Sequence, residues 1–291
     1  MKKILFSILF LFFVQSEANS KSILIKPKQL LDVRSGKMIN ADILIESGVI
    51  KEVSRNIPVL IEYEIIELPD TTILPGLMDA HVHLTGNTDL KGHEGISESS
   101  YLATIYGVKN AKQTLLSGFT TVRNVGASNY SDVALRDGIE QKAILGPTLL
   151  VSGPPLGITG GHCDSNILPA EYEYKAQGVA DGPWEVRRKV RENKKYGVDL
   201  IKYCATGGVM SKGTNVNNRQ YTLDEMKAIV DEAHTLGMKV AAHAHGLDGI
   251  RMAIDAGVDS VEHSSLIDQE TVNLAISNNV FLSMDIYVSD Y

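Results

Sequence analysis

Short apolar segments alternate with helix-like segments from residue 78 to residue 285 of this 291-residue sequence. Continuous apolar strands of this kind indicate a parallel sheet that is buried on both faces. Repeated strand–helix units of this length predict an α/β fold, a (β/α)₈ barrel of the TIM type. The expected strands are 78–84, 119–125, 148–152, 198–204, 239–244, 259–263 and 280–285.

Helices are expected between these strands. The sequence around Thr222 is the most specific, because Glu225 follows three residues later and the pair forms a capping-box pattern. Apolar residues then recur every three to four positions up to Leu236, as in an amphipathic helix. The expected helices are 99–116, 132–141, 184–196, 223–236, 248–256 and 268–277.

The barrel predicted over residues 76–291 contains only strands 1–7. The seventh strand ends close to residue 291, and no segment remains for an eighth unit. A complete barrel of this type typically takes about 250 residues. The sequence is therefore expected to be truncated before the eighth barrel strand.

Residues 19–75 have a different pattern. Short alternating segments at 22–25, 41–45, 49–53 and 64–68 are separated by turn residues, and they are typical of short strands. The pattern changes after Leu74-Pro75-Gly76. We expect residues 19–75 to form the N-terminal portion of a small β-sandwich.

The first 18 residues have the pattern of a secretory signal peptide. Lys2 and Lys3 precede an apolar stretch over 4–14, and small residues at Ser16 and Ala18 fit a cleavage site. The stretch is shorter than the roughly 20 apolar residues of a membrane span. A secreted or periplasmic protein with no stable membrane insertion is expected, and an uncleaved anchor is the alternative.

Charge and cysteine content exclude other classes. The formal net charge of −7 argues against a nucleic-acid-binding protein, which needs clustered Lys and Arg. Cys163 and Cys204 are too few for a disulfide scaffold and are interpreted as small packing residues. A homo-oligomer is compatible with the composition.

The placement of histidines indicates a site. His234 falls within an expected helix, but the other seven of the eight lie at strand ends or in the loops that follow. In a TIM-type barrel that end carries the active site. His81 and His83 are two residues apart on one strand, so they share a face, and two imidazoles suit a divalent metal such as zinc.

Four ordered motifs resemble the amidohydrolase superfamily. The first is Leu74-Pro75-Gly76-Leu77-Met78-Asp79-Ala80-His81-Val82-His83-Leu84. The others are Ile201-Lys202-Tyr203-Cys204-Ala205-Thr206-Gly207-Gly208-Val209, Ala242-His243-Ala244-His245-Gly246 and Val261-Glu262-His263. The sequence is most similar to the secreted, prolidase-like members related to imidazolonepropionase.

The resemblance implies a site for two divalent metal ions, with zinc the expected metal. His81 and His83 match the ligands of the more buried metal, and His243 and His263 match those of the second. Lys202 matches the lysine that CO₂ carboxylates, giving a carbamate that bridges both metals. An unpaired lysine inside an apolar strand is otherwise costly.

Other residues are candidates for roles in catalysis and substrate binding. His162, in a Gly-Gly-His element, and His245, two residues after His243, are candidate catalytic residues; loop-stabilising hydrogen bonds are the alternative for both. Arg219 and Tyr221 are candidates for binding a substrate carboxylate, and a solvated loop is the alternative. The superfamily's eighth-strand Asp, a metal ligand and general base, has no counterpart, and its role is not transferred to Asp285 or Asp290.

The expected function is metal-dependent hydrolysis of amide bonds in dipeptides or N-acyl amino acids, as in an Xaa-Pro dipeptidase. The substrate is thus a small molecule or dipeptide. Ring opening or deamination of a cyclic amide, as in imidazolonepropionase, is the first alternative. It is disfavoured because no carboxylate follows His243 before Asp248. An inactive secreted metal-binding protein is the second alternative.

Overall fold

A computed structural model of the chain describes residues 22–285, apart from residues 88 and 91. The predicted signal peptide and Asp290 lie outside the described residues. The chain divides into two compact units, one ending at Pro75 and the other beginning at Gly76. No helix of the described residues has the length and apolar character needed to cross a membrane.

The first unit is a mainly antiparallel sheet with the order β2-β1-β3-β4, and β5 pairs in parallel with β1. Alternation on β3 places Leu44 in one apolar cluster, with Leu24, and Ile43 in another, with Leu30. All four expected strand segments fall within or overlap observed strands, whereas β2 is not anticipated. The β-sandwich itself stays a prediction. The strands are β1 Ile23–Asp32, β2 Lys37–Ile39, β3 Asp42–Glu46, β4 Val49–Ser54 and β5 Glu64–Ile73.

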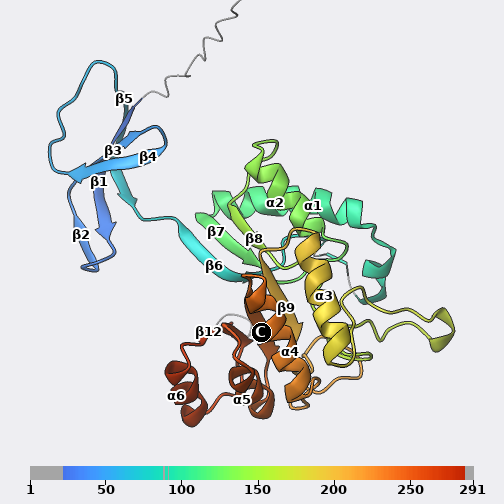
Figure 1. The fold of residues 1–291 in the computed structure, drawn as a ribbon. Coiled ribbons are helices and arrows are strands. Elements are labelled where there is room, and N and C mark those ends of the chain that lie inside the picture. The colour runs from blue at the N-terminus through green and yellow to red at the C-terminus, as the bar shows by residue number, and fades with distance from the viewer. Residues whose placement is uncertain (1–21, 88, 91, 286–291) are drawn as a thin grey trace, which may run out of the picture. The chain divides into compact units, whose positions relative to one another are not determined.

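The second unit alternates parallel strands with helices (Figure 1). Its strands form two parallel sheets, β6-β7-β8 and β12-β11-β10-β9, in which every strand pairs with its neighbour in sequence. They are β6 Leu77–Val82, β7 Phe119–Asn124, β8 Thr148–Val151, β9 Leu200–Cys204, β10 Lys239–Ala244, β11 Ser260–His263 and β12 Phe281–Ser283.

All six expected helices are present. Thr222 caps α4, and the side chain of Glu225 accepts a hydrogen bond from the backbone N–H of Thr222, so the predicted capping box is confirmed. Two short 3₁₀ helices, η1 Gly92–Ser97 and η2 Ala170–Tyr172, were not expected. The helices are α1 Ser100–Leu116, α2 Ser131–Glu140, α3 Pro183–Lys195, α4 Leu223–Thr235, α5 Leu247–Ala256 and α6 Gln269–Ser277.

The segment after β8 connects the two parallel sheets. Leu156 donates its backbone N–H to the carbonyl of Lys202 (2.8 Å) and accepts from the N–H of Cys204 (2.9 Å). Sheet pairing therefore continues from β8 towards β9 in chain order, as the predicted barrel requires. The closed, eight-stranded barrel stays a prediction.

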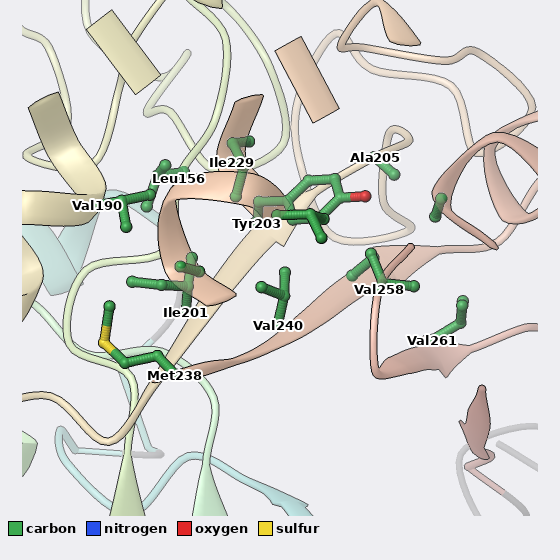
Figure 2. Close-up of a cluster of buried hydrophobic side chains, with 14 of the residues drawn as sticks. Leu156, Val190, Ile201, Tyr203, Ala205, Ile229, Met238, Val240, Val258 and Val261 are labelled. Carbon is green, nitrogen blue, oxygen red and sulfur yellow. The ribbon is translucent and has the colours of Figure 1, made fainter. Parts of the chain in front are cut away.

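The main core lies between the parallel strands and the helices. Figure 2 shows Ile201 and Tyr203 of β9 in this cluster, together with Ile229 of α4 and Val240 of β10. Residues two apart on a strand share a face, so Lys202, which lies between Ile201 and Tyr203, must point the opposite way. The apolar core thereby determines which residues of β9 face the opposite side.

Candidate metal centre

A cavity of about 460 Å³ lies at the carboxyl ends of the parallel strands. Six of the eight histidines line it, so the predicted clustering at strand ends is observed. Apolar residues and a disulfide form the rest of its wall. The lining residues are His81, His83, Val125, Pro155, His162, Cys163, Lys202, Cys204, Val209, Met210, His243, His245, His263 and Asp285.

Strand alternation places the central residues of β9 and β10. Lys202 and Cys204 face the cavity because Ile201 and Tyr203 face the helices. On β10, Ala242 and Ala244 belong to the core, and His243 lines the cavity together with His245, just beyond the strand. These positions follow directly from the two-residue period of a strand.

Hydrogen bonds to oxygen atoms fix the orientation of three imidazoles. His81 donates from Nδ1 to Glu262 Oε2 (3.0 Å), and His83 donates from Nδ1 to the carbonyl of Gly126 (3.2 Å). His243 donates from Nε2 to the carbonyl of Gly207 (3.3 Å). Each ring keeps its other nitrogen as an acceptor, which is the arrangement that metal-binding histidines need.

His263 reaches the cavity through an unusual backbone conformation. Strand register pairs it with Ala244, whose side chain faces the core. His263 has a φ of 71° and Ser264 has a φ of 50°, so the chain leaves strand geometry at this point. Left-handed conformations of non-glycine residues are uncommon and cluster at functional sites. Here the turn brings the ring of His263 into the cavity.

The rings form a contiguous group. The centroid of His263 lies 4.6 Å from those of His81 and His243, and 4.7 Å from that of His245. One ring nitrogen each of His243, His245 and His263 lie within 4.8 Å of one another. A second group of this kind consists of His81, His263 and Asp285. Neutral imidazoles and a carboxylate at this spacing fit a divalent metal such as zinc.

Glu262 forms a buried ion pair beneath the histidines. It is fully buried, and besides His81 it accepts hydrogen bonds from Arg123 Nη2 (2.6 Å) and Ser260 Oγ (2.6 Å). Burial alone would raise the pKa of Glu262, but the bond from His81 and the charge of Arg123 outweigh burial and bring the pKa to about 2. The carboxylate therefore stays ionised and orients His81.

Burial favours the neutral, metal-binding form of the histidines. It is the largest cause that lowers the pKa of His83, His162 and His263 to about 4, and the nearby Lys202 charge contributes to each shift. The pKa of His243 is lowered further, for the same first reason. These imidazoles are thus unprotonated at neutral pH without any metal.

The metal-free protein is expected to become less stable as the pH falls from about 6.5 to about 4. Histidines of ordinary pKa, 6.5, take up protons in the unfolded chain over this range, whereas His83, His162 and His263 in the folded chain do so only near pH 4. Unfolding therefore takes up protons over this range, and the free energy of unfolding decreases as the pH is lowered. Urea denaturation of metal-free protein at a series of pH values measures this, and a flat profile over the range would contradict it.

Burial also changes the chemistry of Lys202. The side chain is almost completely buried, and this burial lowers the pKa of Lys202 to about 8 from its ordinary 10.5, although Glu262 opposes the shift. At pH 7 about one such lysine in ten is an uncharged amine, far more than at an ordinary pKa. An uncharged amine is the form that reacts with CO₂.

Asp285, the last described residue, lies at the cavity. Its Oδ2 contacts His263 Nδ1, and Asp285 lines the same cavity as the histidines. Sequence reasoning transferred no role to Asp285, because it follows the seventh strand. Its carboxylate is nevertheless placed where it could hold a proton or a metal ion.

His162 lies on the long loop between β8 and α3. Its ring lies against that of His243 at a tilt of 31°, with centroids 4.2 Å apart, and its Nδ1 forms a hydrogen bond with Ser211 Oγ (2.9 Å). His245 Nδ1 similarly bonds Ser265 Oγ (2.9 Å). Both candidate catalytic residues thus line the cavity, and both also make the loop hydrogen bonds of the alternative interpretation.

The two candidate substrate-binding residues lie elsewhere. Tyr221 is fully buried and donates its hydroxyl to the carbonyl of Ala180 (3.1 Å), so it belongs to the core. Arg219 is partly exposed and pairs with Asp248, with 3.6 Å between nitrogen and oxygen. Neither side chain lines the cavity.

Two features of the site, a disulfide and a buried ion pair, were missed in the sequence. The interpretation of Cys163 and Cys204 as packing residues is wrong, because they form a disulfide. Glu262 and its partner Arg123 were given no role, although a carboxylate inside an apolar strand carries the same signal as Lys202.

The geometry defines a class of protein: an α/β fold with a histidine-rich cavity, suited to a divalent metal ion, at the carboxyl ends of its parallel strands. The family model described as the amidohydrolase family matches residues 72–290. The chain belongs to the amidohydrolase family, and the resemblance drawn from the four motifs is confirmed.

Several known proteins are similar to this chain. Ochratoxinase of Aspergillus niger is 35% identical over 221 residues, which cover 69% of this chain and 45% of ochratoxinase. An imidazolonepropionase of Fusobacterium nucleatum is 23% identical over 285 residues, covering 84% of this chain and 63% of that protein. The chain thus spans about half to two thirds of the length of these relatives.

A solved structure shares the fold. The crystal structure of an Xaa-Pro dipeptidase with bound methionine has a TM-score of 0.83 and 37% sequence identity, covering 90% of this chain and 66% of that one. This similarity confirms the α/β fold class.

Proposed function

We propose that the protein is a metal-dependent hydrolase of amide bonds, and that its substrates are dipeptides or N-acyl amino acids. The observation that carries this proposal is Lys202: a buried lysine of lowered pKa that lines one cavity with six histidines. A cationic lysine would repel a metal ion. A carbamate formed on the uncharged amine offers two anionic oxygens instead.

The cavity would take two zinc ions, each held by its own pair of histidines. His81 and His83 would hold one ion, and His243 and His263 would hold the other, with carboxylated Lys202 between the two. The fixed hydrogen bonds from His81, His83 and His243 leave one nitrogen of each ring for this purpose. When bound, such a metal pair supplies a hydroxide at neutral pH and polarises the scissile carbonyl.

The remaining side chains would bind and move protons. His162 and His245 line the cavity beside the metal-ligand candidates, and each is anchored by a serine hydroxyl. A neutral imidazole held in this way can donate a hydrogen bond to the oxygen that becomes negative during amide hydrolysis. Asp285, in contact with His263, is placed to take up a proton.

Two observations support a small amide as the substrate. A cavity of about 460 Å³ holds a molecule of dipeptide size. The solved structure with a bound methionine is named an Xaa-Pro dipeptidase, and ochratoxinase also belongs among the similar proteins.

Hydrolysis of a cyclic amide is the second candidate function. It rests on the similarity to an imidazolonepropionase. Asp248, the first carboxylate after His243, is largely exposed and pairs with Arg219 rather than facing the cavity. Proton transfer to a ring nitrogen is therefore less well supported than hydrolysis of an open amide.

A combined metal and activity measurement tests the proposal. The chain is loaded with zinc in bicarbonate, its metal content is determined, and hydrolysis of a dipeptide and N-acyl amino acid panel is followed with an imidazolone as comparison. We expect two zinc ions per chain and turnover of open amides. Bound zinc without turnover of any substrate would favour the binding-protein alternative, and turnover of the imidazolone alone would favour the cyclic amidohydrolase.

We also propose a secreted or periplasmic location. The disulfide between Cys163 and Cys204 supports it, because disulfides persist in oxidising compartments and are rare in the cytosol.

A further inference from the structure

The disulfide belongs to the wall of the metal cavity. It joins Cys163, on the long loop after β8, to Cys204, at the end of β9, across 41 positions of sequence and a Cα–Cα distance of 6.0 Å. Both cysteines line the cavity that contains the histidines. The loop is thereby attached covalently to the strand that carries Lys202.

Cys163 directly follows His162, so the disulfide fixes the backbone beside this candidate catalytic ring. The backbone N–H of His162 also donates to Gln220 Oε1 (3.0 Å), and the ring of His162 lies against that of His243. The loop from β8 to α3 contains the short helix η2 and isolated bridges at Leu156 and Gly157, but no helix or strand includes the segment around His162. Without a covalent link, such a loop can open locally at a small cost in free energy.

Two glycines leave room for this arrangement. A Cβ atom at Gly157 would lie 2.6 Å from Cβ of Cys163, and one at Gly208 would lie 2.2 Å from Cε1 of His162. Both distances are far below a normal contact between carbon atoms. The backbone at Gly157 therefore lies directly against Cys163, and the backbone at Gly208 lies directly against the ring of His162. These close contacts restrict where both residues can lie.

We propose that the Cys163–Cys204 disulfide is a positioning element that holds the ring of His162 against His243 in the cavity. The metal ligands His81, His83, Lys202, His243 and His263 lie on or next to strands and do not depend on the disulfide. Breaking it should thus leave metal binding intact and displace His162. The role of His162 in turnover rests on the proposed function, whereas the effect of the disulfide on the position of the His162 ring does not rest on it.

The first test measures the position without any activity. The phosphine tris(carboxyethyl)phosphine reduces the disulfide of the metal-free full chain: two electrons and two protons give two thiols, and the phosphine takes an oxygen from water. The Cε1–H resonance of His162, assigned by its loss in His162→Ala, is expected to move because the ring current of His243 changes. The resonance of His234, which pairs with Asp259 away from the cavity, serves as control.

The double variant Cys163→Ser/Cys204→Ser repeats the measurement without a reductant. The His162 resonance should move in the same direction as in the reduced chain, while His234 is unchanged. An unmoved His162 resonance in the reduced chain would overturn the proposal, and this outcome does not depend on whether the double variant folds.

The second test uses turnover with zinc bound. The double variant is expected to keep its zinc content and its KM but to lose kcat by about 10²-fold, as expected for a misplaced catalytic group. In the His162→Ala background, removal of both cysteines should cost nothing further, because contributions of groups that act together are not additive. If the kcat losses caused by His162→Ala and by removal of both cysteines instead multiply in the combined variant, the proposal is overturned. A wild-type chain with no turnover would contradict the proposed function, and the resonance of His162 would still decide the positioning role.

Discussion

Replacement of Lys202 by alanine is expected to remove the paired metal site and nearly all hydrolysis. Carboxylated Lys202 would bridge two histidine pairs, one at the end of β6 and one from β10 and β11. Loss of a group that only supports a ligand costs about 10–100-fold in metal affinity. Loss of a bridging ligand should cost more, and kcat should fall by at least about 10³-fold since the metal-supplied hydroxide is lost with the metal.

Lys239→Ala is the matched control. Lys239 begins β10, is exposed, and pairs with Asp259. Zinc content, measured by elemental analysis after dialysis, should stay unchanged in Lys239→Ala and fall below two in Lys202→Ala. Two zinc ions and ordinary turnover in Lys202→Ala would exclude the carbamate.

Glu262→Ala is expected to cause the largest loss of stability, about 3–5 kcal/mol, because it removes a fully buried carboxylate and leaves the partly buried Arg123 without its partner. Arg123 donates to Glu262 at 2.6 Å, and His81 loses the acceptor that orients its ring. Urea denaturation of metal-free protein measures the change in the free energy of unfolding. Zinc affinity should also fall by about 10–100-fold.

Glu270→Ala provides the comparison for this variant. Glu270 pairs with Arg251 at 2.9 Å, but its side chain is 83% exposed. Exposed ion pairs contribute about 0–1 kcal/mol, so the unfolding free energy should hardly change. Equal, small effects of the two substitutions would contradict the role of Glu262 as a buried anchor.

Periodicity predicted the elements and part of the site. Strand alternation at Ile201 and Tyr203 determines that Lys202 faces the cavity, and the same argument places His243 and His245. The predicted helix boundaries agree closely with the observed ones where the sequence contains a capping residue, as at Thr222. These are local properties of the chain, so the sequence contains the information needed to predict them.

The remaining features depend on contacts between distant residues or on unusual backbone conformations. His263 reaches the cavity only because its φ of 71° breaks the alternation of β11. The Arg123–Glu262 pair joins β7 to β11, and the Cys163–Cys204 bond joins a loop to β9. Tyr221 was expected at the substrate, but its position follows from core packing around Tyr203, whose ring lies 6.0 Å away.

Anomalous diffraction at the zinc edge, from crystals of the chain grown with zinc and bicarbonate, tests the metal centre itself. We predict two zinc positions in the cavity, one bound by His81 and His83 and the other by His243 and His263, with additional density on Nζ of Lys202. A cavity without zinc, or a single zinc beside an unmodified Lys202, would contradict the proposed centre.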